Sequence, residues 1–219
     1  MATTTQRGTL EAATGGAGAE VVGGIGAVVL SIVGLANVVP ELMVSIAGIV
    51  IGAAFVLEGA VIAAEYSRLL STADASAQRS SEVGGLTIEM LAGLVGIVLG
   101  VLSIIGIDPP VLMACSAIVF GSALVLSSGA IARLNDFKTQ ATPAGAALPP
   151  AQTVVQEAMA AAAGAQVFTG LAAIVLGILA LVNISPPTLT LVALLAVGAT
   201  ILLRGSAIGS RSFSMLKWE

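Results

Sequence analysis

Six long apolar stretches constrain this chain more than any other feature. They cover residues 19–38, 41–65, 85–107, 110–134, 163–183 and 187–210. A transmembrane helix needs about 20 mostly apolar residues, so each stretch is long enough to cross a membrane. Only 9% of the residues are charged, against about 25% in an average soluble domain. The sequence therefore predicts an all-α, polytopic integral membrane protein with six transmembrane helices.

The six predicted spans pair into three tight hairpins, and each hairpin breaks at a proline. These prolines are Pro40, Pro109 and Pro186. Proline suits the first turn of a helix, because its missing N–H is not needed there. We therefore expect each proline to begin the second helix of its hairpin. Asn37, Gly106 and Asn183 stand just before the breaks and are typical of helix ends.

Polar segments separate the hairpins within a single membrane domain. The expected division is a tail at 1–18, hairpins at 19–66, 85–135 and 153–211, linkers at 67–84 and 136–152, and a tail at 212–219. An alanine-rich segment at 151–165 precedes the third hairpin. It either extends the fifth helix or lies along the membrane surface.

The basic residues predict the orientation in the membrane. Those in the tails and long linkers are Arg7, Arg68, Arg79, Arg133, Lys138, Arg211 and Lys217, and the short hairpin turns carry none. Cytoplasmic loops are enriched in Lys and Arg, so we expect both termini in the cytoplasm and the protein in the inner (plasma) membrane. The polar start of the chain lacks the charged and apolar regions of a signal peptide.

The hairpins are internal repeats. A shift of 69 residues lays the first on the second, and a shift of 77 lays the second on the third. The glycines that recur in the pattern are Gly24, Gly52, Gly59, Gly93, Gly100, Gly121, Gly170, Gly177, Gly198 and Gly205. Small residues let membrane helices approach closely, so these glycines are expected to pack helices together. Parallel copies can surround a pseudo-threefold axis or lie in a row.

This pattern resembles the short-repeat family typified by the acid-resistance membrane protein HdeD. The repeats read Gly24–Ser31–Pro40–Gly52–Gly59, Gly93–Gly100–Pro109–Gly121–Ser128 and Gly170–Gly177–Pro186–Gly198–Gly205, with Ser31 and Ser128 in place of expected glycines. The resemblance covers nearly the whole chain outside the tails and linkers. It implies a six-span inner-membrane protein, in some members linked to acid stress, and it supplies no catalytic residues.

Two sets of repeat-equivalent polar residues are the candidates for function. Glu58, Ser127 and Arg204 share one position in the second helices. Charges inside a membrane are costly and mark functional sites by default. Glu58 and Arg204 are interpreted as an ion pair between the first and third hairpins. The alternatives are that Arg204 snorkels to the surface while Glu58 is protonated, or that the two gate a polar pathway.

The second set, Glu20, Glu89 and Gln166, opens the first helix of each hairpin. Acidic residues at a helix start interact favourably with the helix dipole. The alternative is a ring of carboxylates at a cation entrance. Glu89 has apolar neighbours, which would suit a proton sensor.

The composition excludes several function classes. There is no histidine and a single cysteine, Cys115, so His-based catalysis, His–metal sites and an internal disulfide are excluded. Cys115 lies in an apolar run and is expected to be a small buried hydrophobe. No basic patch suggests nucleic acid. We expect that the protein is not an enzyme and that it binds no metal ion and no cofactor.

The sequence favours a structural or stress-related membrane protein that binds lipids and self-associates, or binds partners, through its glycine-rich faces. One alternative is a pore or carrier for protons or small solutes that uses Glu58 and Arg204. The other is an accessory subunit of a larger membrane complex.

Overall fold

The computed structural model is all-α. It describes the backbone of residues 3–70, 79–141 and 150–216, and the side chains of 18, 20–60, 88–128 and 163–205. The helices are α1 (Thr3–Leu35), α2 (Pro40–Leu70), α3 (Arg79–Ile104), α4 (Pro109–Ala141), α5 (Pro150–Leu181) and α6 (Pro186–Leu216). No strand occurs in the described ranges.

The three short turns share one conformation. The even-numbered helices begin at Pro40, Pro109 and Pro186, where the sequence places them. Asn37, Gly106 and Asn183 have positive φ angles of 65°, 91° and 66°. The residue after each donates its N–H to the carbonyl five residues earlier, as Val38 does to Val33 at 3.3 Å. This is the Schellman ending, in which a left-handed residue closes a helix and satisfies its last carbonyls.

The helices are longer than the apolar stretches. α1 begins at Thr3 rather than near residue 19, and α3 begins at Arg79 rather than near residue 85. Parts of the expected tails and linkers are therefore helical. The alanine-rich segment belongs to α5, so it extends the fifth helix and does not lie apart along a surface. Hydropathy marks only the apolar part of a helix, whereas alanine and other good helix formers continue it.

Four helices are long and apolar enough to cross a membrane. The segments are Pro40–Ala60, Pro109–Ser128, Ala163–Leu181 and Pro186–Gly205. The apolar parts of α1 and α3 within the described side chains, Glu20–Leu35 and Ile88–Ile104, are shorter. Large apolar side chains also cover the outside, and Val22 and Phe168 are 71% and 76% exposed. Soluble monomers rarely expose large apolar patches, so this surface is typical of a membrane-embedded protein.

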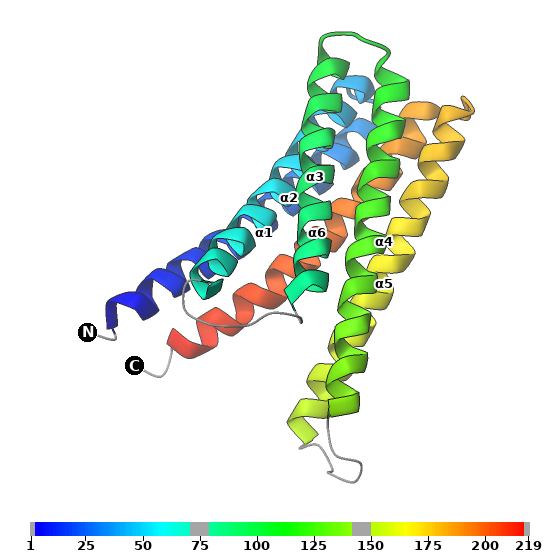
Figure 1. Ribbon diagram of the computed structural model, residues 1–219. Helices are drawn as coiled ribbons and strands as arrows, with labels where there is room; N and C mark the ends of the chain where they lie inside the picture. The colour runs from blue at the N-terminus through cyan, green and yellow to red at the C-terminus, as the bar shows by residue number, and fades with distance from the viewer. Residues whose placement is uncertain (1–2, 71–78, 142–149, 217–219) are drawn as a thin grey trace.

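The helices form a closed ring. Each contacts its neighbours in chain order, and α1 also packs along α6. α2, α4 and α6 contact one another, so they form the inner part of the bundle. In Figure 1 the start of α1 and the end of α6 lie at the same end, opposite the three short turns. The closure of α1 on α6 favours helices around an axis over hairpins in a row.

Repeat-equivalent glycines form the closest helix crossings. A Cβ added to Gly52 on α2 would lie 2.6 Å from the carbonyl oxygen of Gly93 on α3. The equivalent distance from Gly121 on α4 to Gly170 on α5 is 2.5 Å. On the third crossing, a Cβ at Gly24 would lie 2.7 Å from the backbone nitrogen of Leu202 on α6. Each crossing joins two consecutive hairpins, and the third joins the last hairpin to the first.

Candidate functional site

One polar cluster lies in the otherwise apolar interior, and every helix contributes a residue to it. Its members, in the order α1 to α6, are Glu20, Glu58, Glu89, Ser127, Gln166 and Arg204. The structure thus brings the two predicted trios together in one site. Glu20, Glu89 and Gln166 are each at most 3% exposed. We call these six residues the polar cluster.

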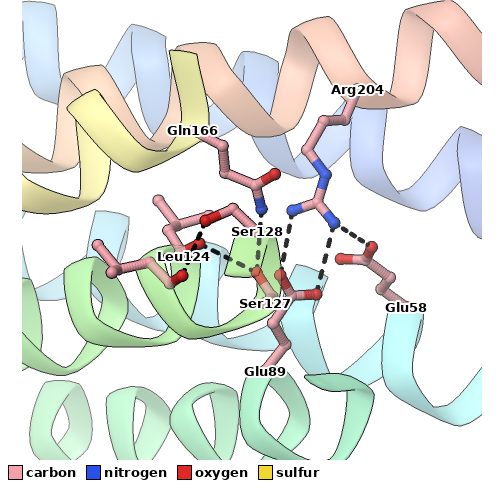
Figure 2. A network of polar contacts seen from close by, with 8 residues as sticks. Glu58, Glu89, Leu124, Ser127, Ser128, Gln166 and Arg204 are labelled. Atoms are coloured by element: carbon pink, nitrogen blue, oxygen red, sulfur yellow. Dashed lines mark hydrogen bonds and ion pairs between the residues drawn. The ribbon is translucent and has the colours of Figure 1, made fainter. Parts of the chain in front are cut away.

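Arg204 is the centre of the cluster. Its Nη2 lies 2.7 Å from Oε1 of Glu58, and its Nη1 lies 3.3 Å from Oε1 of Glu89. Nη2 also donates to Oε2 of Glu89 at 3.4 Å. Figure 2 shows the guanidinium between the two carboxylates, which come from α2 and α3. A planar guanidinium suits such multiple contacts, since its donors form a fixed fork.

Two neutral residues complete another side of the cluster. Gln166 donates from Nε2 to Oγ of Ser127 at 3.1 Å, and Ser127 donates to the carbonyl of Leu124 at 3.2 Å. Figure 2 shows this chain of hydrogen bonds beside the guanidinium of Arg204. The α4–α5 side of the site is therefore satisfied without charge, while the other helices bring charged groups.

Within the polar cluster, Glu20 is the residue that the hydrogen bonds do not explain; outside it, Ser31 Oγ is also buried without a partner. It is 3% exposed, and its Oε2 is buried without a hydrogen-bond partner. Its carboxyl group lies close enough to the carboxyl group of Glu58 and to the guanidinium of Arg204 to interact electrostatically with both. A buried polar atom without a partner is rare in native proteins, so Glu20 marks the incomplete part of the site.

Small residues beside the charged positions let the neighbouring helices approach. A Cβ on Gly205 would lie 2.9 Å from the Cβ of Glu20, and one on Gly59 would lie 2.8 Å from that of Met90. Gly205 follows Arg204, Gly59 follows Glu58, and Met90 follows Glu89. The glycines thus set how closely α1, with Glu20, approaches α6, and how closely α3, with Glu89, approaches α2. Ser128 is the repeat equivalent of Gly59 and Gly205, and its hydroxyl donates to the carbonyl of Val125 on its own helix.

The interior between the polar cluster and the proline turns is closed and mostly apolar, although buried serines such as Ser45 and Ser103 also lie in it. Two sets of repeat-equivalent residues fill it: Ile51, Phe120 and Val197, then Phe55, Leu124 and Ile201. None of these six is more than 1% exposed. The rings of Phe55 and Phe120 meet edge to face at a centroid distance of 5.6 Å. No polar pathway runs through this described part of the interior.

The opposite end holds only a small cavity. Its volume is about 20 Å³, and its lining includes Glu41, Thr190 and the prolines that begin α4 and α6. A volume of this size has room for about one water molecule. Glu41 is exposed, as expected for a turn residue. Cys115, expected to be buried, is half-buried and free.

The remaining predicted residues lie as follows. All ten recurring glycines contact other helices of the same chain. No group of three His, Cys, Asp or Glu side chains with metal-binding geometry occurs in the described ranges. The basic residues and aromatic residues of the tails and linkers, including Arg68, Tyr66 and Trp218, lie outside the described side chains.

The meeting of the two trios is the feature that sequence reasoning missed. A signal was present, because Glu20 lies twenty residues before Pro40 and Glu58 lies eighteen after it. At 1.5 Å per residue these are depths of about 30 Å and about 27 Å from the turn. Two residues at equal depth in a tight hairpin are at the same level of the bundle.

Comparisons with models of protein families, with curated proteins and with solved structures found no match.

Proposed function

We propose that this chain is a non-enzymatic, six-span membrane protein with a structural, stress-related role. Three parallel hairpin repeats around a pseudo-threefold axis are the architecture we assign to it. The support is the recurrence of a close crossing at equivalent glycines between α2 and α3, α4 and α5, and α6 and α1, although Gly24 on the third packs against Leu202 and lies farther from Gly198. The stress-related part depends on the resemblance to the HdeD family, and the inner-membrane location with cytoplasmic termini depends on the distribution of basic residues.

The observation that carries the structural role is the packed hydrophobic core. Ile51, Phe120 and Leu124 are fully buried in one hydrophobic core between the two ends of the bundle. A pore needs a hydrated or polar path for its solute, and the described interior offers none. A protein packed in this way suits a role in which the bundle itself is the functional unit.

Association with a second copy or another membrane protein remains part of the proposal, but through a different surface. The recurring glycines are occupied inside the chain. A partner therefore has the outer apolar side chains to bind, such as Val22, Val98 and Phe168, each more than half exposed. The native mass in lipid nanodiscs tests this: whole multiples of the chain mass support self-association, other polypeptides in fixed ratio support an accessory subunit, and a sole monomer contradicts both.

A carrier for protons or small solutes is the second candidate, and the polar cluster favours it. The side chains of Arg204 and Glu58 keep 22% and 11% of their surface accessible, and buried charges mark transport pathways in many membrane proteins. Reconstituted liposomes separate the two candidates. The structural role predicts no proton or solute flux above that of empty vesicles. Flux that is lost in Glu58→Gln and Arg204→Gln would establish the carrier instead.

A further inference from the structure

We propose that Glu20 and Glu58 form a proton-binding site, in which the two carboxyl groups share one proton inside the bundle. This deepens the proposed structural role and rests on it, because the site ties the packing of the bundle to a bound proton. The argument starts from charge. Arg204 is the only basic residue among the described side chains, and three carboxyl groups surround it.

The charges of the polar cluster do not balance. With every group ionised, three carboxylates and one guanidinium leave an excess of two negative charges. Ser127 and Gln166 are neutral and bond to each other, so α4 and α5 bring no titratable group to the described part of the site. An uncompensated charge in a low-dielectric interior is so costly that the group neutralises instead. The cluster therefore favours a bound cation, and one proton lowers the excess from two negative charges to one.

The contacts indicate where that cation binds. Arg204 occupies Oε1 of Glu58 and both oxygens of Glu89. Glu20 has a buried oxygen without any donor, and its carboxyl group is near enough to that of Glu58 for the two to interact. Two carboxylates cannot hydrogen-bond to each other, because both only accept. A single proton between them completes the pair, as in other sites where two carboxyl groups are adjacent.

A proton fits this site better than a metal ion. The described residues contain no set of three acidic or cysteine side chains with metal-binding geometry. Binding a proton also requires no extra space, and the approach of α6 to α1 leaves little: a Cβ on Gly205 would already lie 2.9 Å from the Cβ of Glu20. The reaction is simple uptake, in which one carboxylate oxygen accepts a proton and the neighbouring carboxylate accepts its hydrogen bond.

The site links protonation to the packing of α1. Glu20 lies on α1, and Glu58 and Arg204 lie on α2 and α6. Loss of the proton leaves two adjacent carboxylates, whose repulsion weakens the contact of α1 with α2. A rise in pH therefore loosens the first helix against the second, while the attraction between Glu20 and Arg204 holds α1 on α6.

Infrared spectroscopy of the protein in lipid bilayers tests the site directly. Carboxyl groups in water are ionised at pH 7, so the carbonyl-stretch band of a protonated acid at that pH reports a buried proton. We expect the wild type to show this band and Glu20→Gln to lose it. Glu41→Gln, at the exposed opposite end, is the matched control and should keep it. A wild type without the band at pH 7, or a band that persists in both Glu20→Gln and Glu58→Gln, overturns the proposal.

A second measurement covers the case in which the variants fold poorly. The folded wild type holds a proton that the unfolded chain releases, so stability is greatest at low pH and falls as pH rises. The unfolding equilibrium constant should increase about tenfold per pH unit over the range in which the folded protein still holds the proton and the unfolded chain has released it. A wild type whose stability does not fall between neutral and alkaline pH contradicts the site. Liposome flux decides the structural role separately, so the two ideas fail by different results.

Discussion

The crossing of α4 and α5 at Gly121 allows the packing of the ring to be tested by one methyl group. In Gly121→Ala the new Cβ would lie 2.5 Å from the carbonyl oxygen of Gly170 and 3.0 Å from the backbone nitrogen of Ile174. Both atoms belong to the backbone of α5, so a side-chain rotation cannot relieve the clash. Ordinary contact begins at 3.4 Å, and the helices must therefore separate by about 0.9 Å.

The cost follows from that separation. Overpacking of a well-packed interior costs about 1–3 kcal/mol, and moving α5 outward also weakens its other contacts with α4. The higher helix propensity of alanine offsets part of this free-energy cost, since glycine is about 1 kcal/mol less favourable than alanine within a helix. We expect a net loss of about 1–2 kcal/mol in the free energy of unfolding, and a larger loss for Gly121→Val.

Gly164→Ala is the matched control on the facing helix. A Cβ at Gly164 meets nothing within 4 Å, so the same chemical change there should be neutral or stabilising by up to about 1 kcal/mol. The assay is equilibrium unfolding in mixed micelles with a denaturing detergent, followed by circular dichroism. If Gly121→Ala proves as stable as Gly164→Ala, the close crossing is absent and the reasoning from the ring is wrong.

Three further substitutions can be measured in the same unfolding assay. Arg204→Gln leaves buried carboxylates unpaired and should lower the free energy of unfolding by about 3–5 kcal/mol. Adding Glu58→Gln should restore part of this loss. A double variant no more stable than Arg204→Gln alone would argue against the ion pair. Asn183→Ala should cost about 1–2 kcal/mol because alanine is strained at a φ of 66°, whereas Asn183→Gly should be close to neutral; equal stabilities would count against the left-handed helix end. Phe120→Ala should cost about 3–5 kcal/mol, since the ring is fully buried, and a small loss would mean that the interior is less tightly packed than described.

Local features of the fold could be predicted from the sequence because their causes are local. A proline has no N–H to donate and therefore suits the first turn of a helix, and α2, α4 and α6 begin at prolines. Asn37 and Asn183 tolerate a left-handed conformation, and both adopt it at helix ends. The helix starts could not be predicted in the same way. Thr3 begins α1 well before the apolar stretch, and hydropathy does not distinguish a polar helix from a polar tail.

The polar cluster depends on a relation that lies between hairpins. The sequence placed Glu58 and Arg204 at one repeat position, but their distance depends on whether the ring closes. In a row of three hairpins the first and last would be apart, and neither Glu20 nor Glu58 would meet Arg204. Closure brings residues separated by 146 positions to within 2.7 Å.

Closure itself depends on the third glycine crossing, and this links the fold to the site. Gly24 of α1 packs against the backbone of α6 at Leu202. Glu20 lies four residues before Gly24 on the same helix. One helical turn separates residues i and i+4 on the same face. The glycine that lets α1 lie on α6 therefore also directs Glu20 toward Arg204 and Glu58. A substitution that opens this crossing should remove the acid from the cluster along with the helix, so the packing of the ring and the charge of its interior cannot vary independently.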